Sequence, residues 1–153
     1  MIQSSMRKII GVIGGRRATK SLLANAEKVG RLIAENGLIL LCGGLGGVME
    51  AAAKGAKEAG GLTVGILPHD TKEHANPYID VPIATGLGIG RNIIIARTAD
   101  ALIAVSGEYG TLSEIAFALQ LGKPVVGINT WDIKGVIQAD NAEDAVQAVI
   151  KLL

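Results

Sequence analysis

The nine residues from Ser106 to Glu114 read SGEYGTLSE and directly follow the apolar run ALIAV (101–105). They therefore stand where a predicted buried strand passes into a predicted helix. Glycines at such a junction let backbone N–H groups approach an anion, and the positive end of the helix dipole adds to the attraction. The segment predicts a phosphate or other anion site. The residues predicted to form its cradle are Gly107, Glu108, Tyr109, Gly110 and Thr111.

Two more glycine clusters follow predicted strands, one after residues 8–14 and one after residues 38–42. In an open α/β sheet the ligand binds outside the carboxyl ends of the strands, so three such clusters at one edge favour an anion site there. The first cluster lacks the third glycine of a dinucleotide fingerprint, no acidic residue ends the second strand, and the P-loop pattern is absent. The candidate ligand-binding residues in these two clusters are Gly14, Gly15, Gly43, Gly44, Gly46 and Gly47.

Charged residues beside these clusters have two interpretations each. Arg91 and Asn92 open a predicted helix, where an arginine opposes the helix dipole, and this conflict suggests that Arg91 is held there for a ligand anion. Thr111 and Glu114 have the spacing of a capping box, worth about 1 kcal/mol, yet a carboxylate at that position would also face the sugar of a bound nucleotide. Spacing alone leaves both roles open for Glu114.

Composition limits the class of protein. The chain has 153 residues, 49% of them hydrophobic and 19% charged, with a net charge of +1, which fits one domain over residues 1–153 and gives no electrostatic signal for nucleic acid. The lone Cys42 excludes an intrachain disulfide, and His69 and His74 lack further ligands for a metal. No apolar run approaches the ~18 residues of a membrane span, and a signal-peptide pattern is absent. We expect a cytoplasmic protein with no metal, membrane or nucleic-acid partner.

Short apolar runs alternate with amphipathic stretches along the chain, which predicts an α/β fold with a doubly wound, mostly parallel sheet and helices on both faces. A TIM barrel would need roughly 200 residues or more. Residues 68–88 break the pattern and are predicted to be an irregular loop, a candidate lid. The predicted strands are 8–14, 38–42, 62–67, 101–105 and 124–128, and the predicted helices are 19–36, 48–59, 90–98, 111–121 and 141–153.

Several stretches together resemble one known family. They are GVIGG (11–15), CGGLGGVMEAAAKGA (42–56), GILP (65–68), NPYIDVPIATGLGIGRN (76–92), ADALIAVSGEYGTLSE (99–114) and LGKPVVG (121–127). This pattern is similar to the lysine-decarboxylase-like family (LOG-like, SLOG) of Rossmann-like proteins, whose decarboxylase label is a misnomer. It is closest to the branch of uncharacterised prokaryotic proteins near the algal molybdenum-cofactor carrier.

The resemblance implies two alternative activities. In the phosphoribohydrolase branch, with the signature PGGxGTxxE, Glu114 and Arg91 would be the catalytic residues that cleave the N-glycosidic bond of a nucleoside 5′-monophosphate. Here Ser106 replaces the proline, Glu108 the second glycine and Asn92 an upstream lysine. In the carrier branch the same cradle would only bind a nucleotide, phosphate or molybdenum cofactor, and no cofactor is expected to be required. The family also implies a homodimer or homotetramer, and a structural protein without a ligand is the third alternative.

Overall fold

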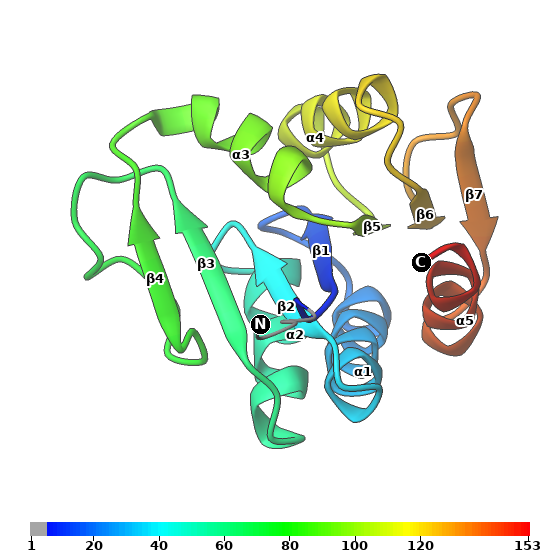
Figure 1. Ribbon diagram of the computed structural model, residues 1–153, viewed down its shortest axis with the longest axis horizontal. Coiled ribbons are helices and arrows are strands. Elements are labelled where there is room, and N and C mark those ends of the chain that lie inside the picture. The colour runs from blue at the N-terminus through cyan, green and yellow to red at the C-terminus, as the bar shows by residue number, and fades with distance from the viewer. Residues whose placement is uncertain (1–5) are drawn as a thin grey trace, which may run out of the picture.

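The structure is a computed structural model that describes residues 6–153. Its centre is one parallel sheet in the order β4-β3-β2-β1-β5-β6-β7, with helices on both faces (Figure 1). The strands are β1 (Ile9–Gly14), β2 (Ile39–Cys42), β3 (Thr63–Leu67), β4 (Val81–Ala84), β5 (Ala101–Val105), β6 (Val125–Ile128) and β7 (Val136–Ala139). The chain winds outward from β1 to β4, then returns to the other side of β1 and winds out to β7. This confirms the predicted doubly wound α/β fold.

The helices divide between the two faces of the sheet. α1, α2 and α5 pack over one core, whereas α3 and α4 pack over the other. Residues alternate between these cores along each strand: Ile103 belongs to the first, and its neighbours Leu102 and Ala104 belong to the second. The helices are α1 (Lys20–Glu35), α2 (Val48–Glu58), α3 (Arg91–Thr98), α4 (Tyr109–Gln120) and α5 (Ala142–Leu152), with a short 3-10 helix η1 (Gly88–Gly90) before α3.

Glycines bring α1 and α2 unusually close together. A Cβ atom on Gly30 of α1 would lie 1.9 Å from the carbonyl oxygen of Ala52, and one on Gly55 of α2 would lie 1.8 Å from that of Glu27. Any larger residue would therefore force the helices apart. A hydrogen bond from Val48 N–H to Gly15 O, 3.0 Å long, then ties the start of α2 to the turn after β1.

The two edge strands lie where the sequence pattern predicts no strand. β4 lies within the predicted loop 68–88 and pairs with β3 in parallel. β7 pairs with β6 in parallel and follows a stretch for which the pattern predicts no element. Both strands have four residues, and both leave side chains in solvent, with Val81, Ile83 and Ile137 each more than 40% exposed. A short edge strand buries too little for a continuous apolar run, and Pro82 in β4 further obscures the pattern.

Helix capping follows the sequence. Thr19 Oγ1 accepts a 3.2 Å hydrogen bond from Leu22 N–H at the start of α1, and Asn141 Oδ1 accepts a 2.8 Å bond from Asp144 N–H at the start of α5. These bonds satisfy N–H groups that have no partner inside the helix. None of the helices within residues 6–153 has the length and hydropathy to cross a membrane.

Candidate functional site

A cavity of about 510 Å³ opens at the carboxyl edge of the sheet, where β1 and β5 lie side by side. This is where the strand order reverses, the position at which open α/β sheets bind ligands. The lining comes from the turns after β1, β2, β3 and β5 and from the starts of α3 and α4. The residues that line it are Ile13, Gly14, Gly15, Arg16, Arg17, Gly43, Met49, Pro68, Gly88, Ile89, Arg91, Asn92, Glu108, Gly110, Thr111 and Glu114.

The three predicted glycine clusters contribute unequally to this cavity. The structure places nine of the predicted site residues on its wall: Gly14, Gly15, Gly43, Arg91, Asn92, Glu108, Gly110, Thr111 and Glu114. Five others lie outside the lining: Gly44, Gly46, Gly47, Gly107 and Tyr109. Spacing predicts which turns meet at the sheet edge, but it does not predict which residues within each turn face inward.

The glycines outside the lining have structural roles. Gly44 has a φ of 79°, and its carbonyl oxygen accepts a 2.9 Å hydrogen bond from Asn76 N–H. Gly47 has a φ of 68°, and a Cβ atom there would lie 2.4 Å from the carbonyl oxygens of both Gly15 and Arg16. These conformations favour glycine because L-residues with a side chain rarely adopt them. The turn after β2 therefore holds two neighbouring segments in place, and only its first glycine, Gly43, faces the cavity.

The turn after β5 has a strained backbone. Ser106 has a φ of 56° and Gly107 a φ of 110°, so two successive residues lie in the left-handed region, where a non-glycine residue such as Ser106 is uncommon. Thr130 Oγ1 donates a 2.6 Å hydrogen bond to the carbonyl oxygen of Ser106 and supports this conformation. Such residues concentrate at functional sites, where the surrounding structure holds them.

The predicted capping box at Thr111 is wrong. Helix α4 begins at Tyr109 and Glu108 is its N-cap residue, with no capping bond from its side chain. The carbonyl oxygen of Glu108 instead accepts a 3.0 Å hydrogen bond from Leu112 N–H. The strained turn allows the helix to start two residues earlier than predicted, and Thr111 and Glu114 therefore lie inside it. The cap role that accounted for Glu114 is removed.

Arg91 is the buried cation of the site. It is only 9% exposed, and its Nε–H donates a 2.9 Å hydrogen bond to the carbonyl oxygen of Ile66, while Nη1 donates to Asn92 Oδ1. Asn92 Nδ2 in turn donates to Ser113 Oγ at 3.1 Å. Burial lowers the pKa of Arg91, and the nearby Glu114 opposes that shift. A guanidinium retains its charge even so, so this network fixes a positive charge at the base of the cavity.

Gly43 makes room for that arginine. A Cβ atom at this position would lie 2.7 Å from Arg91 Nη2 and 2.7 Å from Met49 Sδ. A side chain there would displace the guanidinium or the thioether. The neighbouring Cys42 is fully buried and accepts a 3.4 Å hydrogen bond from Gly44 N–H, and burial raises the pKa of its thiol to about 12. Cys42 is therefore a packing residue, as the sequence predicts.

Glu114 is the buried carboxyl group of the site. It is 7% exposed and lines the cavity, and burial raises its pKa to about 8, an effect that Arg91 only partly opposes. Arg91 and Glu114 are not among the salt bridges of residues 6–153, so no nitrogen of Arg91 lies within 4.0 Å of a Glu114 carboxyl oxygen. A carboxyl group with such a pKa is mostly protonated at neutral pH. The other acidic residue of the lining, Glu108, is exposed at the cavity mouth.

The rim adds features that spacing did not assign. Arg16 and Arg17 line the cavity and are exposed, so they place two positive charges at its mouth. Pro68, which follows β3, and Ile89, which lies in η1, also line the cavity. Neither was predicted as a site residue.

These features define a Rossmann-like α/β protein with a cavity at its topological switch point. The sequence profile of the SLOG cluster4 family matches residues 7–152, and the chain belongs to this family. Among known sequences, it is 49% identical over 142 residues to an uncharacterized protein of Archaeoglobus fulgidus, with 92% of this chain and 93% of that protein covered.

Two solved structures match almost the whole chain. The molybdenum cofactor binding protein from the phototrophic bacterium Rippkaea orientalis has a TM-score of 0.92 and 39% identity, with 97% of this chain and 99% of that chain covered. The molybdenum cofactor carrier protein of Chlamydomonas reinhardtii has a TM-score of 0.88 and 42% identity, with coverage of 95% and 98%.

A cytokinin riboside 5′-monophosphate phosphoribohydrolase of Mycobacterium tuberculosis is a more distant relative. It is 37% identical over 120 residues, which cover 72% of this chain and 64% of that protein. The comparisons therefore confirm the predicted LOG-like family and its proximity to the molybdenum-cofactor carriers.

Proposed function

We propose that this protein binds a phosphate-bearing ligand of the molybdopterin type in the cavity between β1 and β5 and serves as its carrier. The observation that supports this most directly is the near-complete match, in length and in fold, to two proteins named for molybdenum cofactor binding or carriage. A carrier needs a preformed anion site and an enclosing wall, and it needs no committed catalytic group.

The residues present fit such a ligand. Pockets for molecules of this size have volumes of about 300–1,000 Å³, which brackets the 510 Å³ found here. Three arginines line the cavity against two glutamates, one of which is mostly protonated at neutral pH, so the site is net positive. The amides at the start of α4, with Gly110 on the wall and no other atom within 4 Å of its would-be Cβ, leave open space for a phosphate.

Thermal unfolding with a panel of ligands tests this proposal. The panel contains molybdopterin, AMP, inorganic phosphate and molybdate. We expect molybdopterin to give the largest rise in Tm, since a ligand at about 100 times its Kd stabilises a protein by roughly 2.7 kcal/mol. A flat response to every member would overturn the proposal and favour a structural protein without a ligand. Stabilisation by AMP alone would favour a nucleotide ligand instead.

Phosphoribohydrolase activity is a second candidate, supported by one feature of the cavity. Glu114 lies on its wall, where a carboxylate could stabilise an oxocarbenium-like sugar. Two features weigh against turnover. The carboxyl group is mostly neutral at pH 7, and Asn92 is engaged in the bonds that hold Arg91. The test is release of ribose 5-phosphate from AMP, which the wild type would show and Glu114→Ala would lose if the protein were a hydrolase.

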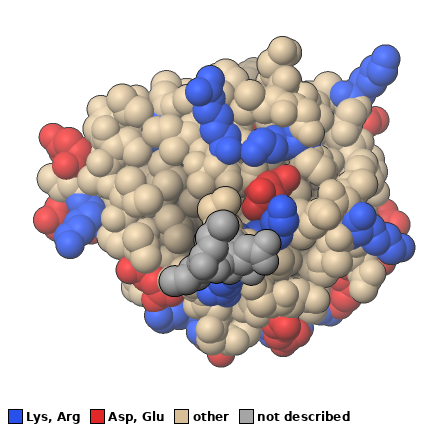
Figure 2. All heavy atoms as spheres, in the orientation of Figure 1, with Lys and Arg blue, Asp and Glu red and all other residues tan. Residues whose placement is uncertain are grey.

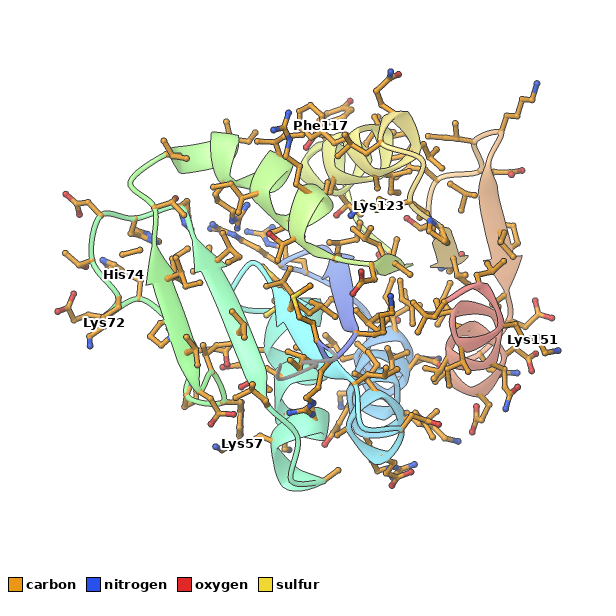
Figure 3. All side chains as sticks on the ribbon, viewed as in Figure 1. Lys57, Lys72, His74, Phe117, Lys123 and Lys151 are labelled. Atoms are coloured by element: carbon orange, nitrogen blue, oxygen red, sulfur yellow. The ribbon has the colours of Figure 1, made fainter. Side chains whose placement is uncertain are left out.

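We also propose that the protein forms a homodimer or homotetramer. Large apolar side chains are exposed: Leu87 and Ile89 before α3, at 56% and 75%, Phe117 on α4, at 40%, and Leu121 at the end of α4, also at 40%. Phe117 points outward from α4, away from the sheet (Figure 3). On the face in Figure 2 a broad area without charge extends over β3 and β4. Light scattering tests the assembly, and Phe117→Asp is expected to dissociate it, whereas a monomeric wild type would contradict it.

A further inference from the structure

Glu114 is a buried polar side chain without a protein partner. The residue is 7% exposed, yet its side chain makes none of the side-chain hydrogen bonds or salt bridges that residues 6–153 form. Within residues 6–153, the Glu114 oxygens are not among the fully buried side-chain atoms that lack a hydrogen bond, so they retain some accessible surface. The carboxyl group therefore faces the cavity, where a ligand can reach it. A buried polar group in this situation is costly unless something bonds to it.

The groups around Glu114 are already engaged. Arg91 donates to the Ile66 carbonyl oxygen and to Asn92, and Asn92 donates to Ser113. The Thr111 side chain, one turn earlier in α4, lies beside Gly107, where a Cβ atom would come within 2.3 Å of Thr111 Oγ1. Turning Arg91 Nε, Arg91 Nη1 or Asn92 Nδ2 toward the carboxyl group would break one of these bonds. Within residues 6–153 the Glu114 carboxyl group therefore has no bonded donor, and a ligand in the cavity can supply one.

The chemistry of a carboxylate selects which part of a ligand it binds. Two carboxylate oxygens accept two parallel N–H bonds from a planar donor pair, the geometry that makes arginine–carboxylate pairs strong. A pterin presents such a pair along one edge, through its ring N3–H and its 2-amino group. The phosphate at the other end of the ligand instead requires the amides and arginines of the cradle. A phosphorylated pterin would thus use both kinds of group in this cavity.

We propose that Glu114 is the specificity-determining residue of the site and that it binds the 2-amino-4-oxopyrimidine edge of a pterin through two N–H···O bonds. This inference rests on the proposed function and names the part of the ligand that the protein recognises. On binding, the carboxyl proton leaves for solvent and the carboxylate accepts both donors. Because burial raises the pKa of Glu114 to about 8, this proton is present at pH 7 before the ligand binds.

A matched pair of ligands tests the recognition. 6-Hydroxymethylpterin monophosphate carries the 2-amino group, and 6-hydroxymethyllumazine monophosphate carries an oxygen in its place. We expect calorimetry at pH 7 to give the wild type roughly 10- to 100-fold tighter binding of the pterin, because the lumazine oxygen would face a carboxylate. Glu114→Gln should reduce that preference to within about threefold. Glu58→Gln, an exposed change on α2, serves as the matched control and should retain the preference.

Proton release gives a test that needs no variant. Titrations in two buffers of different ionisation enthalpy should show that the wild type releases about one proton when it binds the pterin at pH 7. Equal preference in wild type and Glu114→Gln, or binding without proton release, would overturn the role of Glu114 while the anion site stands. Failure of the wild type to bind either phosphate would overturn the proposed function as well.

Discussion

Gly14 at the end of β1 lies opposite Val105 at the end of β5, and a Cβ atom on Gly14 would come within 2.3 Å of the Val105 carbonyl oxygen. The two strands that frame the cavity can therefore lie this close only because one of them ends in glycine. The same methyl group would also lie 2.6 Å from Val48 Cγ1 of α2.

We predict that Gly14→Ala destabilises the protein by about 3 kcal/mol, because backbone atoms cannot move aside as a flexible side chain would. Urea unfolding measures this change. Gly110→Ala is the matched variant, since no atom lies within 4 Å of its would-be Cβ and the residue is helical. It should raise stability by about 0.5–1 kcal/mol while weakening ligand binding, because its methyl group would enter the cavity. Equal stability of the two variants would contradict the close approach of the strands.

The pH dependence of stability should reveal the buried Glu114. Burial raises its folded-state pKa from 4.5 to about 8, so the folded protein holds the proton more tightly than the unfolded chain. Stability is therefore full below pH 4.5 and is lost as the pH rises through the window up to about 8. In that window Glu114→Gln should gain on the wild type by up to about 1.4 kcal/mol per pH unit.

Urea titrations at pH 5, 6, 7 and 8 measure this difference between the wild type and Glu114→Gln. Glu35→Gln, an exposed change on α1, controls for the loss of one carboxylate. Parallel stability curves for wild type and Glu114→Gln would show that the carboxyl group is ionised throughout.

The rim arginines should affect binding without affecting folding. Arg16 and Arg17 are exposed, and their side chains form no hydrogen bond or salt bridge among those recorded for residues 6–153. Arg16→Ala and Arg17→Ala are each expected to change stability by no more than about 0.5 kcal/mol. Each should weaken binding of a phosphate-bearing ligand, and the loss should shrink as salt is added. A loss that is the same at low and high salt would contradict this electrostatic role.

Cys42 should resist thiol reagents. It is fully buried, and burial raises the pKa of its thiol to about 12, so almost no thiolate exists at pH 8. We predict that a disulfide reagent such as DTNB modifies the folded protein only at the rate at which the protein unfolds. Reaction in denaturant gives the reference rate. Rapid modification of the folded state would show that Cys42 is accessible from the adjacent cavity.

The sequence carried most of the information needed for the fold. Continuous apolar runs such as 101–105 predict buried strands because both faces of the sheet are covered, and all of the predicted central strands are present. The edge strands β4 and β7 were not predictable in this way, since three of the four residues of β4 and two of the four of β7 are exposed. The glycine clusters at the ends of the predicted strands indicated the edge of the sheet at which the cavity lies, and the family resemblance added the alternative activities.

The site was predicted at the level of turns and not of side-chain directions. Glu114 lies on the cavity wall, but its spacing from Thr111 also fitted a capping box, and only the early start of α4 after the strained backbone at Ser106 removed that role. No pattern in the sequence predicts that Ser106 has a left-handed backbone conformation. For the same reason Gly43 and Gly44, which are adjacent and of one type, could not be told apart: the first faces the ligand site and the second packs away from it.

The glycine contact between α1 and α2 has a consequence for access to the cavity. Gly30 and Gly55 hold these helices in close backbone contact, and the bond from Val48 holds the turn after β1 against α2. Widening the cavity on this side would break those contacts. We therefore expect the residues around Pro68 and Ile89 to move when the entrance opens.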